Sequence, residues 1–191
     1  MVTRENIELA FDGYVPEQLP VQQGTHAAVA LIVRQAASGL QILFIERAVN
    51  ENDPWSGNIS FPGGKVENGD GAPRATAERE TWEEVGIDLR QAHFLGRLSD
   101  IAGVRIPVHV SCFVYLVEDI GPFRLMSEEV QDVFWVLLAD LMDPSRHGEK
   151  VVRFDGQTMI RPGITLPRAG EPVLWGLTHQ LVMDFIRLLN I

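Results

Sequence analysis

The stretch from Gly64 to Ile87 reads GKVENGDGAPRATAERETWEEVGI and decides how this chain is interpreted. Its second half, Glu78 to Glu84, packs four glutamates and an arginine into what its pattern predicts to be one helix. Carboxylates crowded on one helical turn repel one another, and a divalent cation would remove that cost. We therefore predict a divalent metal site on this helix.

The spacing of the glutamates supports this prediction. Glu80 and Glu84 are four residues apart and share a helix face. Glu83 lies about 60° to one side, at roughly 100° per residue. Arg79 precedes Glu83 by four residues and can pair with it or hold a neighbouring loop. The alternative is a solvated acidic face with one surface ion pair, but the glycine-rich turn before the helix and Gly86 after it favour a site.

The core Arg79-Glu80-x-x-Glu83-Glu84-x-Gly86-Ile87, with Gly64 upstream, resembles the Nudix box. This motif marks hydrolases that cut a nucleoside diphosphate linked to another group. In the family's usual pattern, five residues separate the glycine from a glutamate, and seven more separate that glutamate from the Arg-Glu core. Here Asp70 holds the place of that glutamate, and eight residues separate it from Arg79. The added residue lies in the loop and leaves the core intact.

The resemblance implies a role for each residue of the core. Glu80 and Glu84 would be ligands of Mg²⁺ or Mn²⁺, and Glu83 a further ligand or the residue that positions water. The Gly64 carbonyl would complete the coordination shell, and the absence of a side chain lets the backbone approach the ion. Arg79 would orient the catalytic groups.

Residues outside the core are assigned on weaker patterns. The family often takes a general base from a separate loop, for which Glu128 and Glu129 are the candidates. The alternative is that they form only a capped, solvated turn. Four residues are candidates for substrate binding: Arg47, Trp55, Phe61 and Gly63. For Arg47 the alternative is a surface ion pair. For Trp55 the alternative is a hydrophobic plug.

The segments Leu43–Arg47 and Asp53–Gly64 are similar to the extended motif of the coenzyme A pyrophosphatase branch of the family. That branch usually has a serine where this chain has Ala48 and a basic residue where it has Asp53. Coenzyme A or a derivative is therefore the expected substrate. A nucleotide sugar, ADP-ribose or an oxidised nucleotide is the alternative, and Asp53 favours it.

Length, net charge and cysteine content limit the number of domains, the partners and the location that we expect. A chain of 191 residues suits one well-buried domain. Its net charge of −10 argues against a nucleic-acid polymer as partner and leaves a small nucleotide-type substrate admissible. The start of the chain shows no signal-peptide pattern, no stretch has the length of a membrane span, and Cys112 is the only cysteine, so we expect a cytoplasmic protein. Analogy with related enzymes suggests a homodimer.

The pattern along the chain predicts an α/β (α+β) fold with a mixed sheet sandwiched between helices, as the Nudix resemblance also implies. We expect an N-terminal extension at residues 1–24, with Ile7, Leu9 and Phe11 packing on a domain at 25–191. The expected strands are Ala27–Arg34 and Gln41–Arg47, joined as a hairpin, then Phe94–Leu98, Val108–Val117, Val133–Leu137 and a second hairpin around Asp155-Gly156. The expected helices are Ala72–Val85, capped by Asp70 and set against a sheet edge, Leu138–Met142 and Leu174–Leu189.

Two other classes are weighed against an enzyme. A catalytically silent module that senses a nucleotide would not need every acidic ligand of the core. A calcium-binding regulator would carry its ligands at alternating positions of a loop, whereas these lie within a helix. The sequence therefore favours a hydrolase.

Overall fold

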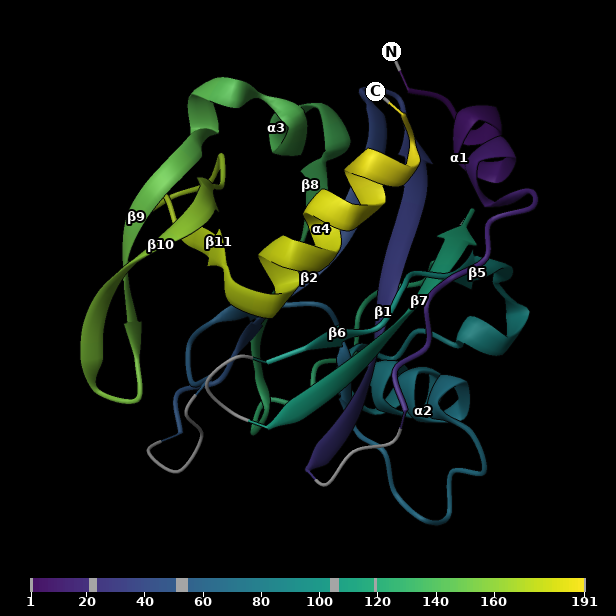
Figure 1. Ribbon diagram of the computed structural model, residues 1–191, viewed down its shortest axis with the longest axis horizontal. Helices are drawn as coiled ribbons and strands as arrows, with labels where there is room; N and C mark the ends of the chain where they lie inside the picture. Colours follow the sequence, from purple (N-terminus) through teal and green to yellow (C-terminus); the bar gives the residue numbers. More distant parts are fainter. Residues whose placement is uncertain (1, 21–23, 51–54, 104–106, 119, 191) are drawn as a thin grey trace.

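The computed structural model describes residues 2–20, 24–50, 55–103, 107–118 and 120–190 (Figure 1). The helices are α1 (Arg4–Phe11), α2 (Pro73–Val85), α3 (Leu138–Met142) and α4 (Gly176–Leu188), with 3-10 turns at Leu89–Gln91 and Pro144–Arg146. The strands are β1 (Thr25–Ala36), β2 (Gly39–Arg47), β3 (Ile59–Ser60), β4 (Gly63–Lys65), β5 (His93–Arg97), β6 (Ile101–Ala102), β7 (Val108–Val117), β8 (Val130–Leu137), β9 (His147–Phe154), β10 (Gln157–Thr165) and β11 (Val173–Trp175). None of the described helices has the length and apolar character needed to span a bilayer.

Strand β1 lies at the centre of the larger sheet. The strands follow the order β3-β2-β1-β7-β5, with β4 also paired to β1, β6 to β7 and β8 to β2. β1 and β7 are parallel, whereas β1 and β2 form the expected antiparallel hairpin, with Ala36 opposite Gly39 at its turn. The sheet is therefore mixed, as predicted.

Each face of this sheet is covered by a helix. Side chains alternate along a strand, so neighbouring residues of β1 enter different cores. Ala30 and Ile32 belong to the same buried cluster as Ala77 of α2, and Leu31 belongs to that of Phe185 of α4. In Figure 1, α4 (yellow) crosses in front of the sheet. The predicted sandwich is confirmed, but its acidic helix packs on the face of β1 and β4, so the expected position against a sheet edge is wrong.

A second sheet of order β11-β10-β9 follows β8. Its β9–β10 hairpin turns at Asp155 and Gly156, both with positive φ, as the sequence predicts. The expected closing helix begins two residues late, because Leu174 and Trp175 pair with β10 as part of β11. The Trp175 indole N–H donates to Oδ1 of Asn58 at 3.2 Å, which ties the second sheet to the loop before β3.

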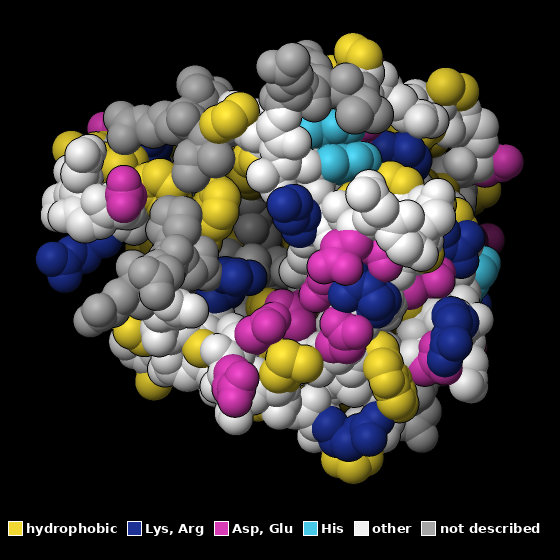
Figure 2. Space-filling model, turned by 90° about the horizontal axis from the view of Figure 1, so that it is seen from below, with side chains coloured by type: hydrophobic (Ala, Val, Ile, Leu, Met, Phe, Trp, Pro, Cys, Tyr) yellow, Lys and Arg dark blue, Asp and Glu magenta, His cyan; other side chains and the backbone are white. Residues whose placement is uncertain are grey.

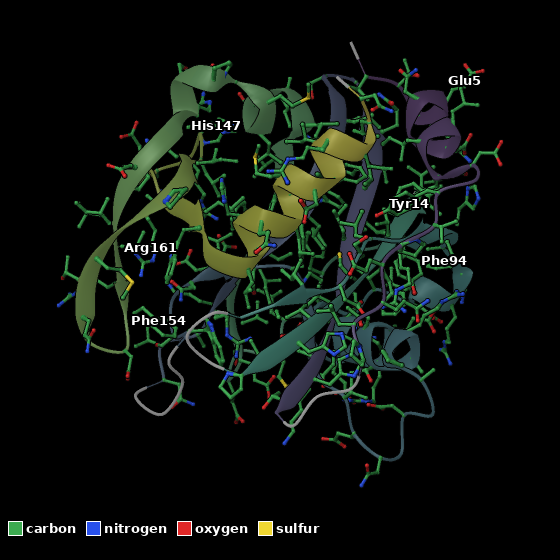
Figure 3. All side chains as sticks on the ribbon, viewed as in Figure 1. Glu5, Tyr14, Phe94, His147, Phe154 and Arg161 are labelled. Atoms are coloured by element: carbon green, nitrogen blue, oxygen red, sulfur yellow. The ribbon has the colours of Figure 1, made fainter. Side chains whose placement is uncertain are left out.

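The N-terminal segment packs on the larger sheet through α1. Thr3 and Asn6 form a capping box at the start of this helix, a local signal that fixes an element the sequence analysis left undefined. Ile7 is fully buried, as expected. The expectation that Leu9 packs on the domain is wrong, because its side chain is 63% exposed. Beyond α1, the hydroxyls of Tyr14 and Ser99 lie 2.9 Å apart (Figure 3).

Replacing Ile7 by alanine should lower the free energy of unfolding by about 2–4 kcal/mol, because a buried side chain loses its contacts and leaves a cavity. Leu9→Ala, on the same helix, is the matched control and should change it by less than about 0.5 kcal/mol. Urea denaturation followed by circular dichroism measures both. Equal effects of the two substitutions would show that α1 is not anchored through Ile7.

Candidate active site

Helix α2 carries the acidic residues, and its two ends are formed differently. It begins at Pro73, and Gly86, with a left-handed φ of 78°, ends it as expected. The expected N-terminal cap by Asp70 is wrong, because Ala72 is the N-cap residue and no side chain caps it. Asp70 precedes the cap by two residues, and its carboxylate reaches along the first turn instead. There it accepts a hydrogen bond from the Thr76 hydroxyl at 2.7 Å.

Arg79 holds three carboxylates in place. Its Nε and Nη2 donate to the two oxygens of Asp70 at 2.8 and 3.1 Å. Its Nη1 lies 3.0 Å from Glu83 and 2.9 Å from Glu80. The expected Arg79–Glu83 pair is confirmed, and Arg79 also holds the neighbouring loop, the other expectation, through Asp70. The sequence alone did not name Asp70 as the partner, although it stood at an acidic position of the motif. This guanidinium holds the pKa of Asp70 well below its usual range, and Asp70 in turn raises the pKa of Arg79.

The carboxylate of Glu80 lies directly against the backbone of β4. A Cβ on Gly64 would come within 2.4 Å of the Glu80 carboxyl carbon, so any other residue at this position would displace the Glu80 carboxylate. Burial raises the pKa of Glu80, Arg79 opposes this, and the charges of Glu83 and Glu129 add to it. The structure therefore brings Glu80 and Gly64 together, as the sequence analysis required of two metal ligands.

Glu84 is the most deeply buried acidic residue of α2, with 1% of its surface exposed. Its Oε2 accepts a hydrogen bond from the backbone N–H of Gly63 at 2.8 Å. Burial raises the pKa of Glu84 to about 8, despite the opposing effects of this hydrogen bond and of Arg47. A buried carboxyl group with a pKa this high gains strongly from a nearby positive charge.

Two residues from outside α2 reach the same cluster. The charge of Glu129 adds to the raised pKa values of both Glu80 and Glu84, and the charge of Arg47 acts on Glu84 in the opposite sense. The pairing of β2 with β8 shifts register between Glu46 and Arg47. A bulge of this kind changes the direction in which the neighbouring side chains point. Both candidate bases, Glu128 and Glu129, are exposed to solvent.

Two candidates for substrate binding have other surroundings. The Phe61 side chain is 2% exposed and stacks on Phe44 with ring centres 5.2 Å apart. The expectation that it contacts substrate is wrong, because it belongs to the core. The Trp55 ring lies 6.1 Å from that of Phe154 in the second sheet, which favours the hydrophobic plug over a stacking platform. Asp53 lies outside the described residues.

The residues at this site fit a hard divalent cation in their chemistry. They provide carboxylate oxygens, which Mg²⁺ and Mn²⁺ prefer, and the turn at Gly64 leaves no side chain between backbone and carboxylate. Within the described ranges, no three histidine, cysteine or acidic side chains already converge as a ligand set. Arg79 holds Glu80 and Glu83, and the Gly63 N–H holds Glu84. Figure 2 shows acidic side chains gathered around basic ones on this face.

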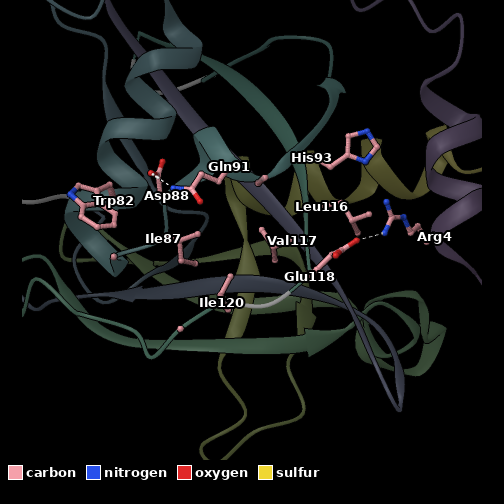
Figure 4. A pocket seen from close by; sticks show the side chains of 13 residues that line it. Arg4, Trp82, Ile87, Asp88, Gln91, His93, Leu116, Val117, Glu118 and Ile120 are labelled. Carbon is pink, nitrogen blue, oxygen red and sulfur yellow. Dashed lines mark hydrogen bonds and ion pairs between the residues drawn. The ribbon is translucent and has the colours of Figure 1, made fainter.

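A cavity of about 460 Å³ lies elsewhere, between the end of α2, the end of β7 and Arg4 of α1 (Figure 4). Trp82 and Ile87 line it, and none of the acidic cluster does. Trp82 is two residues from Glu80 and from Glu84 and so faces away from them. The cavity and the carboxylates therefore lie on different sides of α2. The carboxylates are the candidate active site, because they form the core of the motif and two of them have raised pKa values.

The family follows from a comparison with known domains. The NUDIX domain matches residues 24–154, which include the glycine turn, α2 and the Glu129 loop. The chain belongs to the Nudix family. The structure of a MutT/Nudix family protein from Enterococcus faecalis superimposes on this chain with a TM-score of 0.60 at 13% sequence identity. The match covers all of this chain and 76% of the other. This likeness shows the fold.

Two relatives are similar in sequence. A protein of uncharacterised function from Schizosaccharomyces pombe is 39% identical, over 78% of this chain and 56% of its own length. The Nudix hydrolase NudL of Yersinia pestis, also uncharacterised, is 29% identical over 78% of this chain and 73% of its own. This chain thus spans little more than half the length of the yeast relative.

Asp70→Asn should lower the melting temperature at neutral pH by about 2–6 °C, because two charge-assisted hydrogen bonds to Arg79 are weakened. The pKa of Asp70 is depressed in the folded chain, so its stabilisation is present above the ordinary value of 3.8 and is lost as pH falls below it. The difference from wild type should therefore shrink in acid. Thermal melts across pH measure this difference in melting temperature, and Asp155→Asn at a hairpin turn is the control. A difference that stays constant down to about pH 2 would contradict the pairing of Asp70 with Arg79.

Proposed function

We propose that this chain hydrolyses a diphosphate bond in a nucleotide-type substrate, with Mg²⁺ or Mn²⁺ as cofactor. The observation that carries the proposal is the buried Glu84 carboxyl group, held by the Gly63 N–H at 2.8 Å on the helix face that it shares with Glu80. Burial raises its pKa to about 8, and the charges of Glu80 and Glu129 add to this effect. Burying and crowding carboxyl groups costs the fold free energy, whereas a bound cation would be stabilised by all of them.

Each residue has a part in the proposed reaction. When bound, the ion supplies charge neutralisation at phosphate oxygens and lowers the pKa of water. Glu80, Glu84 and the Gly64 carbonyl would hold it, and Glu83 would add a ligand or orient the attacking water. Arg79 keeps the carboxylates of Glu80 and Glu83 in place through its Nη1.

The remaining roles fall to residues from two loops. Both Glu128 and Glu129 are exposed, and Glu129 is the better candidate for the general base because its charge acts on Glu80 and Glu84. Arg47, at the end of β2 and acting on Glu84, would meet the substrate phosphates. Gly63 provides the N–H that fixes Glu84, so its contribution is to the site rather than to the substrate.

Coenzyme A or a close derivative is the proposed substrate, on the similarity of Leu43–Arg47 and Asp53–Gly64 to the coenzyme A pyrophosphatase branch. The second candidate is a nucleotide sugar, ADP-ribose or an oxidised nucleotide, favoured by Asp53, a carboxylate where that branch has a basic residue. We further propose a homodimer in the cytoplasm, with residues 1–24 as an extension of a domain at 25–191.

Glu83→Gln and Glu84→Gln should each lower kcat by at least about 100-fold. The fold should persist, because the Glu84 carboxyl group is largely protonated at neutral pH without an ion, and glutamine resembles that form. Mass analysis of the two phosphomonoester products, with and without Mg²⁺, measures activity, and Glu149→Gln on exposed β9 is the control expected to stay active. Full activity in both variants would rule out this site.

A screen of diphosphate substrates separates the two candidates. We expect coenzyme A to yield phosphopantetheine, identified by mass, at a higher kcat/KM than ADP-ribose or a nucleotide sugar. The comparison is made at equal Mg²⁺ concentration, with the Glu84→Gln variant as the background. No phosphopantetheine above that background would remove the narrower assignment while leaving the reaction class intact.

A further inference from the structure

The loop from Gly121 to Glu129 is attached to the C-terminal end of α2. Its backbone N–H groups at Arg124 and Met126 donate to the carbonyls of Val85 and Glu84, each at 3.0 Å. The last carbonyls of a helix have no partner within it, so the loop supplies the missing hydrogen bonds. It is thereby bound to the same turn of α2 that carries Glu84.

The Arg124 side chain adds a second attachment. Its guanidinium carbon lies 4.6 Å from the ring centre of Trp82, a cation–π contact. A Cβ on Gly86 would come within 3.1 Å of Cβ and 3.2 Å of Nε of Arg124, so the glycine that ends α2 also makes room for this side chain. Trp82 is 47% exposed, and the contact therefore lies at the surface rather than in the core.

The other end of the loop is attached to the larger sheet. The Glu129 carbonyl accepts a hydrogen bond from the N–H of Ala48 at 2.8 Å, just beyond β2. The Glu129 N–H donates to the Met126 carbonyl at 3.0 Å, and the Val130 N–H donates to the same oxygen at 2.8 Å. Only Ser127 and Glu128 separate the two attachments, so a displacement of Met126 from α2 is transmitted to Glu129.

We propose that Trp82 and Arg124 are positioning residues for the hydrolysis: their contact holds the Gly121–Glu129 loop on α2 and so sets the place of Glu129 relative to Glu80 and Glu84. This inference rests on the proposed function and deepens it. Neither residue touches the substrate. They act from the side of α2 that faces away from the carboxylates, through the backbone of the loop.

The first test is the Arg124→Ala variant, examined by amide hydrogen exchange and kinetics. Losing an exposed cation–π contact should raise the exchange rate of the Met126 amide by about 2- to 5-fold. Because the attached state of the loop loses population by at most the same factor, kcat should fall by no more than about 2- to 5-fold, while KM stays within about twofold of wild type. Trp82→Ala should reproduce both effects, and Trp82→Phe, which keeps an aromatic face, should restore most of the activity.

Two controls make the test specific. Arg34→Ala removes a comparable contact, 4.0 Å from guanidinium carbon to the Trp135 ring, at the far end of β1, and should leave both Met126 exchange and kcat unchanged. In a Glu129→Gln background, Arg124→Ala should cause no further loss of kcat, because its effect acts through Glu129. A further loss as large as in the wild-type background would overturn the proposal.

The outcomes separate this inference from the function on which it rests. If the wild-type chain hydrolyses no diphosphate, the proposed function fails, and the positioning role fails with it. If the wild-type chain is active but Arg124→Ala keeps wild-type exchange at Met126 and wild-type kcat, only the positioning role is overturned. The exchange measurement needs neither metal nor substrate, so it reports on the loop attachment by itself.

Discussion

A carboxyl group held almost entirely out of water organises this structure. Glu84 accepts a hydrogen bond from the N–H of Gly63. This bond joins α2 to the glycine turn and, through β4, to the central strand β1. The turn can approach only because it lacks side chains, since a Cβ on Gly63 would lie 2.3 Å from the Ala28 carbonyl oxygen. Burying Glu84 costs free energy as long as no positive charge compensates it. The fold thus keeps a place in which a cation would be stabilised.

Much of the fold is predictable where the signal is local. The hairpin of β1 and β2, the bounds of β7 and α3, and the end of α2 at Gly86 follow from apolar runs interrupted by glycines and turn residues. The shared face of Glu80 and Glu84 follows from helical spacing alone. These features need no knowledge of which distant segments meet, and that is why they could be inferred from residue order.

Features that depend on distant contacts were not predictable in this way. Asp70 pairs with Arg79 instead of capping the helix, because its carboxylate lies alongside the first turns of α2, where it also meets the Thr76 hydroxyl. Phe61 is in the core because Phe44 of β2 lies beneath it, and Trp55 packs on Phe154 of a sheet formed about a hundred residues later. Spacing along the chain carries no information about such partners, so only the folded structure assigns them.

A calorimetric titration with Mn²⁺ tests the central claim most directly. The pKa of Glu84 is raised from 4.5 to about 8, so between these values the ion-free chain carries a proton there that the cation must displace. We expect proton release on binding, an affinity that rises with pH until about 8, and neither effect in Glu84→Gln. Absence of binding to the folded chain, or equal proton release by the variant, would contradict the account.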